Sequence, residues 1–293
     1  IAHAAHDATH YGFDLTLNGH DWDLLRERRE AYVERLNGIY ARNLANKKIV
    51  VFRGFARFCG PNTVQVADTT LTASRVVIAT GGRPSVPPIP GAELGMTSDG
   101  FFALRERPAR VAVAGSGYIA VEIAGIFTAL GSETSLVLRQ DRVLRQFDSM
   151  LGDTLMKIMR DDGVEIATQA VPRAVTRDAD GTLRLLTEDG RTLGPFDALV
   201  WAIGRDPIVH DIGLERAGVR LDDRGYIAVD RYQATNVTDI FAIGDVTDIK
   251  QLAHFASAQG KAAAEIIAGH AAQTHWRSVP AATFTNPEIA SVG

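Results

Sequence analysis

Residues 110–139, RVAVAGSGYIAVEIAGIFTALGSETSLVLR, decide the fold of this chain. A short apolar run ends at a Gly-Ser-Gly turn, an apolar stretch without proline follows, and a second apolar run begins after Gly131. This order predicts a strand, a helix and a second strand. Such a crossover is right-handed and makes its two strands parallel, so the sequence predicts an α/β fold.

The glycine turn of this stretch has the GxGxxA pattern of a dinucleotide-binding site, with Gly115, Gly117 and Ala120 at the fixed positions. Gly115 permits the tight turn, Gly117 lets the backbone approach a pyrophosphate, and Ala120 lets the helix pack closely on the strand. The free N–H groups and the positive end of the helix dipole bind the anion. An ordinary glycine turn between a strand and a helix is the alternative.

The end of the second strand decides which nicotinamide cofactor such a site accepts. An acidic residue there binds the ribose 2′-hydroxyl of NADH and repels a 2′-phosphate. In this chain Arg139 holds that position and Arg145 follows shortly after, whereas Glu133 lies at the other end of the strand. Two guanidinium groups can clamp a phosphate through charge-assisted hydrogen bonds, so the pair favours NADPH. Solvated surface charges are the alternative interpretation.

Length and composition limit the classes of protein to which this chain can belong. The chain has 293 residues, 46% of them hydrophobic, and a formal net charge of −4, which predicts about two globular domains and no nucleic-acid partner. The absence of a long apolar run predicts no membrane span, and we expect a cytoplasmic protein. Cys59 is the single cysteine, so no internal disulfide, CxxC pair or multi-cysteine zinc site is possible, and we predict no metal site.

The remaining segments predict further elements. The spacing of apolar residues over 21–46 indicates a helix with Asp21 as its N-cap, and the four prolines of 81–91 indicate an extended connection. Short β-rich runs over 49–79 predict a small antiparallel sheet. The other predicted elements are a helix at 148–162, a β-rich stretch at 164–200, a strand at Ala198–Ala202, a hairpin at Val219–Val229, a strand at Ile240–Ile243 and a helix at 252–268.

Three further strands end in small residues, in the sequences IATGG (78–82), WAIGR (201–205) and FAIGD (241–245). Open α/β sheets bind ligands at such carboxyl ends. Each turn alone is a weak signal, since such a sequence is more often a plain turn and Asp245 alone is more often a helix cap than a ligand.

Together with the glycine turn, these segments resemble the pyridine nucleotide-disulfide oxidoreductases, the flavoprotein disulfide reductases, and within them the glutathione reductases. The likeness covers residues 1 to about 247 and includes YGFD (11–14), RLNGIYARNL (35–44), GFARF (54–58), SDGFFAL (98–104) and RQDRVLRQFD (139–148). It implies two Rossmann-like FAD/NAD(P)-binding domains, each with a central parallel sheet and an antiparallel β-meander. The implied divisions are 1–81 for the FAD-binding domain, 82–207 for the NADPH-binding domain, 208–276 for a return to the FAD-binding and central region, and 277–293 for the start of a dimerisation domain.

The resemblance also implies roles for single residues. Tyr118, as a lid over the flavin, and Glu122 would be catalytic, although helix-start packing also explains Tyr118. The residues implied to contact NADPH are Gly115, Ser116, Gly117, Ile119, Glu122, Arg139, Arg145, Gly204 and Arg205. Those implied to contact FAD are Ala56, Thr80, Gly81, Gly244, Asp245, Leu252 and Ala253. Tyr40 and Lys261 are implied on the substrate side, although Tyr40 also fits a helix-face core position.

The chain departs from the family pattern in two respects. The family's redox pair CxxxxC and first FAD fingerprint would lie before Ile1, and its HxxxxE acid/base pair after Gly293, so we expect a segment of a longer polypeptide that cannot turn over by itself. From about residue 248 the sequence is more similar to dihydrolipoamide dehydrogenases and mercuric reductases. Lys261 stands where glutathione reductases have an arginine, and His254 either faces the flavin or simply lies on a helix.

The function implied by the resemblance is transfer of hydride from NADPH to FAD and reduction of a small disulfide, with glutathione disulfide as the expected substrate. We expect a homodimer. A dihydrolipoamide dehydrogenase or mercuric reductase is the alternative among enzymes. A nucleotide-binding module without catalysis of its own is the alternative from another class.

Overall fold

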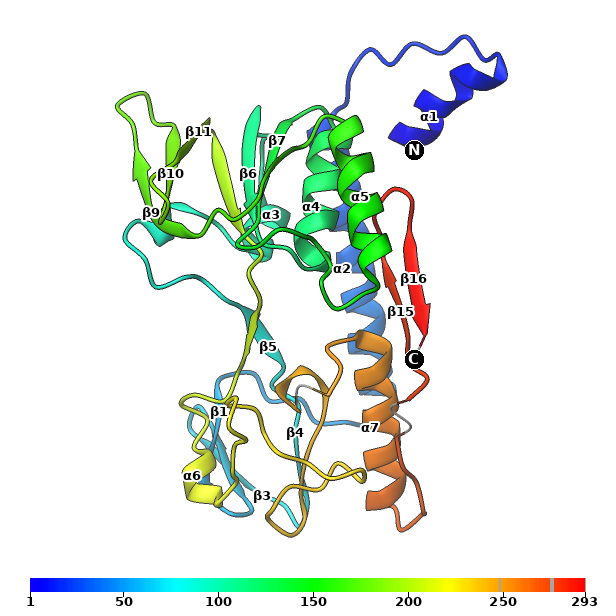
Figure 1. The fold of residues 1–293 in the computed structure, drawn as a ribbon. Helices are drawn as coiled ribbons and strands as arrows, with labels where there is room; N and C mark the ends of the chain where they lie inside the picture. The colour runs from blue at the N-terminus through cyan, green and yellow to red at the C-terminus, as the bar shows by residue number, and fades with distance from the viewer. Residues whose placement is uncertain (248, 275–276, 293) are drawn as a thin grey trace. The chain divides into compact units, whose positions relative to one another are not determined.

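The computed structural model describes residues 1–247, 249–274 and 277–292 (Figure 1). Its contacts divide the chain into two compact units. Unit 1 comprises residues 1–36, 84–204 and 282–290, and unit 2 comprises residues 37–83, 205–281 and 291–293. Among the described residues, no helix combines the length and apolarity that a membrane crossing needs.

Unit 1 is built around a parallel sheet of four strands in the order β12-β6-β7-β8. The strands are β6 (Arg110–Ala114), β7 (Glu133–Val137), β8 (Glu165–Ala167) and β12 (Ala198–Trp201), and the crossover helices are α4 (Tyr118–Ala129) and α5 (Ser149–Asp161). The strand-helix-strand unit predicted for 110–138 and the helix predicted near 148–162 are thus confirmed. So is the α/β fold class.

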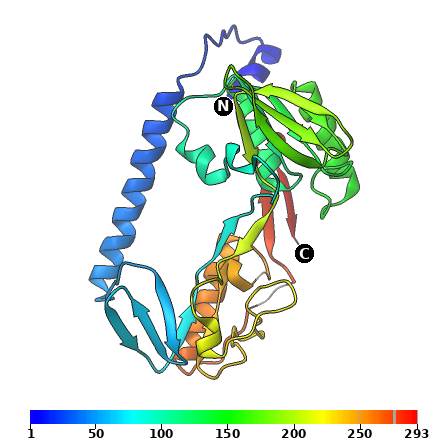
Figure 2. The same cartoon turned by 90° about the vertical axis from the view of Figure 1, so that its left-hand side faces the viewer.

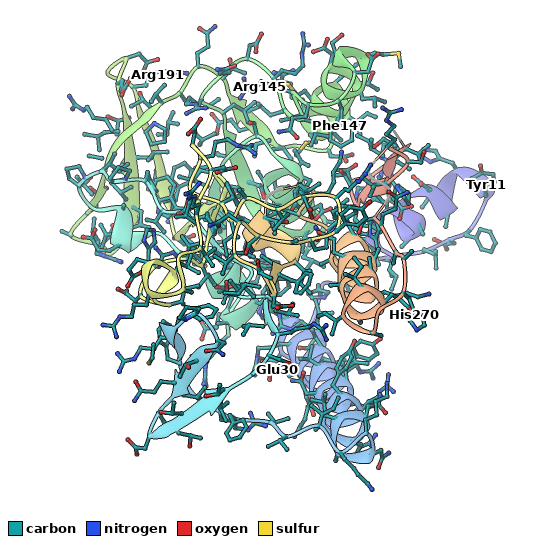
Figure 3. All side chains as sticks on the ribbon, turned by 90° about the horizontal axis from the view of Figure 1, so that it is seen from below. Tyr11, Glu30, Arg145, Phe147, Arg191 and His270 are labelled. Atoms are coloured by element: carbon teal, nitrogen blue, oxygen red, sulfur yellow. The ribbon has the colours of Figure 1, made fainter. Side chains whose placement is uncertain are left out.

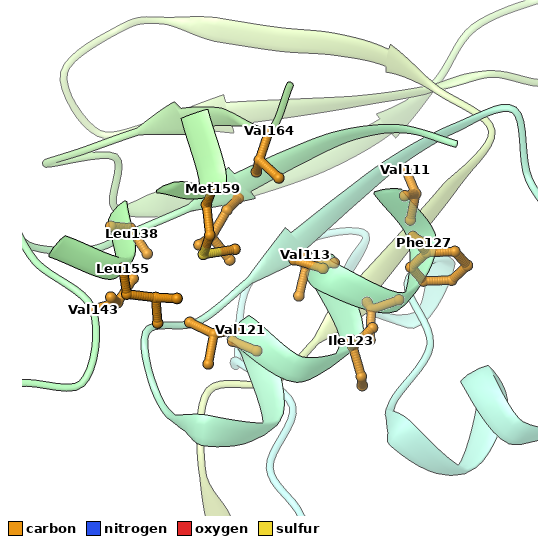
Figure 4. Packing of buried hydrophobic residues seen from close by; sticks show 14 of the residues in the cluster. Val111, Val113, Val121, Ile123, Phe127, Leu138, Val143, Leu155, Met159 and Val164 are labelled. Atoms are coloured by element: carbon orange, nitrogen blue, oxygen red, sulfur yellow. The ribbon is translucent and has the colours of Figure 1, made fainter. Parts of the chain in front are cut away.

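Both faces of this sheet are covered, as the apolar strands require. Val111 and Val113 of β6 point to one face, where they pack with Phe127 of α4 and with Leu155 and Met159 of α5 (Figure 4). The intervening residues Ala112 and Ala114 point to the other face and pack with residues of the strands β9 (Pro172–Arg177), β10 (Leu183–Thr187) and β11 (Thr192–Phe196). These three strands form the antiparallel meander expected in this region.

The other elements of unit 1 are short, apart from α2 (Trp22–Asn46), which continues past the boundary between the units. Asp21 caps α2 as predicted, its Oδ1 accepting from the N–H of Leu24 at 2.9 Å. The remaining elements are α1 (Ala2–Ala8), η1 (Thr9–Tyr11), η2 (Ala92–Leu94), α3 (Ser98–Ala103) and the paired strands β15 (Pro280–Thr283) and β16 (Ile289–Val292), whose ends extend into unit 2.

Unit 2 contains a small antiparallel sheet and a two-stranded parallel sheet. β1 (Ala56–Gly60), β2 (Thr63–Val66) and β3 (Thr69–Thr72) form the antiparallel one, drawn in blue to cyan in Figure 2. β4 (Val76–Ile78) pairs in parallel with β14 (Ile240–Ala242). The other elements are β5 (Gly82–Pro84), β13 (Arg205–Pro207), α6 (Leu214–Ala217), η3 (Gly244–Thr247) and α7 (Ala253–Ile267).

Parts of the predicted β-structure in unit 2 are wrong. Residues 49–52 form no strand, because they have no pairing partner among the described residues, and Val50 is 74% exposed. Val76–Ile78 pairs in parallel with β14 and not with the antiparallel sheet. The hairpin predicted at 219–229 is reduced to a single bridge between Leu221 and Ile227, since the carboxylate of Asp222 accepts from two backbone N–H groups of the turn and competes with a ladder.

The predicted domain boundaries at 81/82 and 207/208 remain predictions. The two units change at 83/84 and 204/205, and they divide the chain ends differently from the predicted domains. The boundary predicted at 276/277 involves a residue outside the described part of the chain, as does the end of the predicted dimerisation segment at 293.

Candidate nucleotide-binding sites

The glycine turn lies at the carboxyl end of β6, in the centre of the parallel sheet of unit 1. The N–H of Gly115 donates to the carbonyl of Val137, the last residue of β7, at 3.0 Å, and φ of Gly115 is +146°. A Cβ placed on Gly115 would lie 2.1 Å from the carbonyl oxygen of Ala202. The chain therefore needs glycine at this position for a close backbone approach.

Gly117 meets a different requirement. It is the N-cap of α4, with φ −83° and ψ 179°, which any residue can adopt, and no atom lies within 4 Å of where its Cβ would be. In the described structure no side chain caps the N-terminus of α4, and its first turn contains no acidic residue. The N-terminal end of α4 and the open space beside Gly117 fit a pyrophosphate, which the helix dipole attracts.

The segment after β7 is held beside this turn. The N–H of Leu144 donates to the carbonyl of Ser116 at 2.8 Å, and Leu144 is buried with φ +49°, a left-handed conformation that is unusual for leucine. Arg145, labelled in Figure 3, follows directly and is exposed. Its guanidinium donates to the side chain of Gln140. The backbone thus brings Arg145 to the same edge of the sheet as the glycine turn.

Arg139 lies at this edge as well, two residues after β7 ends, and it is exposed. Within the described part of the chain its guanidinium has no hydrogen-bond or ion-pair partner. By contrast, Arg142, between the two arginines, is engaged with Asp153 at 2.7 Å. Among the described residues nothing holds the Arg139 guanidinium back from an added anion, and the phosphate clamp stays a prediction.

The turn after β12 completes the edge. The N–H of Ala202 donates to the carbonyl of Ala114 at 2.8 Å, and the carbonyl of Gly204, whose φ is +144°, accepts from Ser85 at 3.0 Å. The structure thus places the turns that contain the predicted NADPH-contacting residues Gly115, Ser116, Gly117 and Gly204 at one sheet edge. Ile119 is the second residue of α4 and packs partly against the core of unit 1.

Glu122 of α4 binds another part of the chain. Its Oε1 accepts a hydrogen bond from the backbone N–H of Phe284 at 2.8 Å. Burial raises the pKa of the Glu122 carboxyl, and the hydrogen bond from Phe284 opposes that rise. Tyr118, at the start of α4, is 38% exposed. The catalytic roles implied for these two residues remain predictions.

In unit 2, the turns that follow the parallel strands β4 and β14 lie at the same edge of their sheet. β4 leads to Thr80 and Gly81, β14 leads to Gly244 and Asp245, and the N–H of Ile243 donates to the carbonyl of Ile78 at 3.0 Å. Thr80 Oγ1 donates to the carbonyl of Ile208 at 2.7 Å. The structure therefore brings together Thr80, Gly81, Gly244 and Asp245, the central residues of the predicted FAD set.

Arg205 belongs to this second edge. Its Nε lies 3.7 Å from Asp245 Oδ2, and its Nη2 donates to the carbonyl of Gly82. Nε is buried and has no hydrogen-bond partner among the described residues, since 3.7 Å exceeds a hydrogen-bond distance. The contact of Arg205 with NADPH stays a prediction. The structure shows its contact with Asp245.

Gln259 of α7 is a site residue that sequence reasoning missed. It is fully buried, and its Oε1 accepts from the N–H of Gly244 at 2.8 Å. Its Nε2 donates to Oε1 of the buried Gln233 at 2.9 Å. A glutamine in the middle of an alanine-rich helix was the available signal, because a buried amide needs partners.

The other predicted site residues of unit 2 lie on the elements α2, β1 and α7. Tyr40 is 66% exposed on α2, so the packing role is wrong in the described structure. Ala56 begins β1, and Lys261 is exposed on α7. Leu252 is the N-cap of α7, and Ala253 is its first residue. Their contacts with flavin or substrate remain predictions.

Comparison with known proteins supports a common architecture. Residues 2–260 match the family model described as pyridine nucleotide-disulphide oxidoreductase. A glutathione reductase from Schizosaccharomyces pombe is 38% identical over 287 residues, which are 94% of this chain and 62% of that protein. A copper(II) complex of the HOCl-induced flavoprotein disulfide reductase RclA from Escherichia coli superposes with a TM-score of 0.88 at 27% identity, over 99% of this chain and 66% of that one. The chain thus spans slightly less than two thirds of each of these relatives.

Proposed function

The chain belongs to the pyridine nucleotide-disulphide oxidoreductase family, and from this premise we propose that it forms the nucleotide-binding part of an NADPH-dependent reductase of a small disulfide. Glutathione disulfide is the proposed substrate. FAD and NADPH are the proposed cofactors, as the similarity to the glutathione reductases implies. We further propose a cytoplasmic homodimer.

One observation carries the choice of NADPH. The hydrogen bond from Leu144 to Ser116 and the one from Gly115 to Val137 hold the segment with Arg139 and Arg145 beside the glycine turn. A pyrophosphate on the N-terminus of α4 would orient the adenosine half of the cofactor toward these arginines. The arginines would then hold the 2′-phosphate that distinguishes NADPH from NADH.

The turns of unit 2 would bind FAD, as the turns of unit 1 would bind NADPH. Asp245 offers a carboxylate acceptor for hydroxyl groups, and Arg205 and Gln259 hold its turn in place. When bound, NADPH supplies the hydride and FAD passes the electrons on to a disulfide. The contribution of this chain is to bind and orient both nucleotides.

The test is a steady-state assay of FAD-loaded protein produced from the complete coding sequence. We expect glutathione disulfide to be reduced with NADPH, and much more slowly with NADH. Oxidation of dihydrolipoamide with NAD⁺, or NADPH-dependent reduction of Hg²⁺, in place of glutathione disulfide would assign the protein to another member of the family. A protein that binds nucleotides but supports none of these reactions would be a binding module and would contradict the proposal.

A further inference from the structure

Two histidines and an aspartate gather on the first helical segment of the chain. They are His6, Asp7 and His10, and all three are exposed. One possible ligand atom from each lies within 4.8 Å of the others. The ring centroids of His6 and His10 are 5.7 Å apart, and His6 Nδ1 lies 3.5 Å from Asp7 Oδ1.

The backbone explains why the two imidazoles face each other. α1 ends at Ala8 and η1 begins at Thr9, but both residues keep right-handed helical angles, with φ −55° and ψ −31° at Ala8 and φ −62° and ψ −34° at Thr9. His10 therefore stays one turn beyond His6, and side chains at this spacing are neighbours on a helix surface. Thr9 Oγ1 also donates to the carbonyl of His6 at 2.8 Å, which braces the junction.

The donor set selects the kind of cation. Two imidazole nitrogens and one carboxylate oxygen suit borderline divalent ions such as Zn²⁺, whereas Mg²⁺ and Ca²⁺ prefer sites made of oxygen. Histidines at positions i and i+4 of a helix are an established arrangement of zinc ligands. The geometry points to a Zn²⁺ site formed by His6, Asp7 and His10, with water as the remaining ligand.

This site departs from the sequence-based expectation that the chain has no metal site. That expectation considered cysteine patterns, whereas the signal is the pair of histidines in HDATH at 6–10. A bound ion would join the end of α1 to η1, and α1 is a seven-residue helix that has no buried residue and no side-chain cap in the described structure. Because so short a helix is marginal by itself, metal binding and helix order should be coupled.

The test is calorimetric titration of the 293-residue chain with Zn²⁺ alone. We expect one saturable site. His6→Ala and His10→Ala each remove a ligand, so each should weaken it by at least about 10- to 100-fold, the loss already caused by removing a residue that only supports a ligand. His270→Ala, which removes an exposed histidine after α7 (Figure 3), should leave it unchanged.

All of the substituted side chains are exposed, so folding should be preserved, and unchanged tryptophan fluorescence would verify this. A chain that takes up no Zn²⁺ in a saturable manner would overturn the proposal. So would affinity that survives both His6→Ala and His10→Ala, or that falls equally in His270→Ala.

Discussion

Substitutions of the two glycines in the turn after β6 should affect different properties. Gly115 is needed for the stability of the fold, whereas Gly117 is needed for the binding of NADPH. Gly115→Ala would place a Cβ 2.1 Å from the carbonyl oxygen of Ala202 and 3.2 Å from the Cβ of Ala120, at a φ of +146°. Backbone strain of this kind costs about 1–3 kcal/mol, and overpacking costs about as much again. We therefore expect Gly115→Ala to lower the free energy of unfolding by about 2–6 kcal/mol.

Gly117→Ala is the matched control. Its φ of −83° suits alanine, and its Cβ would meet nothing within 4 Å. We expect its free energy of unfolding to change by less than about 1 kcal/mol. The added methyl group would occupy the place where the backbone approaches the pyrophosphate, so NADPH binding should weaken by about tenfold or more.

The assay is urea unfolding followed by the fluorescence of Trp201, which is buried in unit 1, together with NADPH titration of each variant. The reasoning is refuted if the two variants lose stability equally. It is also refuted if Gly117→Ala binds NADPH as tightly as the unmodified chain, since Gly117 then has no part in the site.

Two further predictions concern buried polar groups. Burial raises the pKa of Glu122, so the stability it contributes is full below its unfolded pKa and is lost as the pH rises through the folded pKa. Glu122→Gln keeps an acceptor for Phe284 and removes this loss. In urea titrations the variant should therefore gain stability relative to the unmodified chain as the pH rises above about 4, the ordinary pKa of a glutamate. A difference that stays constant with pH would contradict the assignment. Gln259→Leu leaves the N–H of Gly244 and the amide oxygen of Gln233 without the partners they have in the structure, which should cost about 2–4 kcal/mol in the same assay. A loss below about 0.5 kcal/mol would show that water replaces the glutamine.

The sequence predicted those features that depend on neighbouring residues. The strand-turn-helix pattern around Gly115 and the position of Arg139 at the end of β7 are local, and both are where the pattern indicated. The Asp21 cap is also local, because its partner Leu24 lies three residues away.

Contacts between distant residues could not be predicted in this way. Glu122 and Phe284 are 162 positions apart, and only the folded chain brings them together. Leu144 adopts a positive φ to reach Ser116, which no propensity favours in leucine. Residues 49–52 have the composition of a strand but lack a strand to pair with in the described structure. Strand propensity alone therefore gave a wrong prediction.

The selection of NADPH by Arg139 and Arg145 is tested most directly by calorimetry with NADPH and NADH on the unmodified chain and on Arg139→Ala, Arg145→Ala and Arg160→Ala. Arg160, exposed in the last turn of α5, is the control. Loss of charge-assisted hydrogen bonds to a phosphate should weaken NADPH binding by about 10- to 100-fold in each of the first two variants, with NADH binding unchanged. An unchanged ratio of the two affinities in Arg139→Ala and Arg145→Ala would contradict the phosphate clamp.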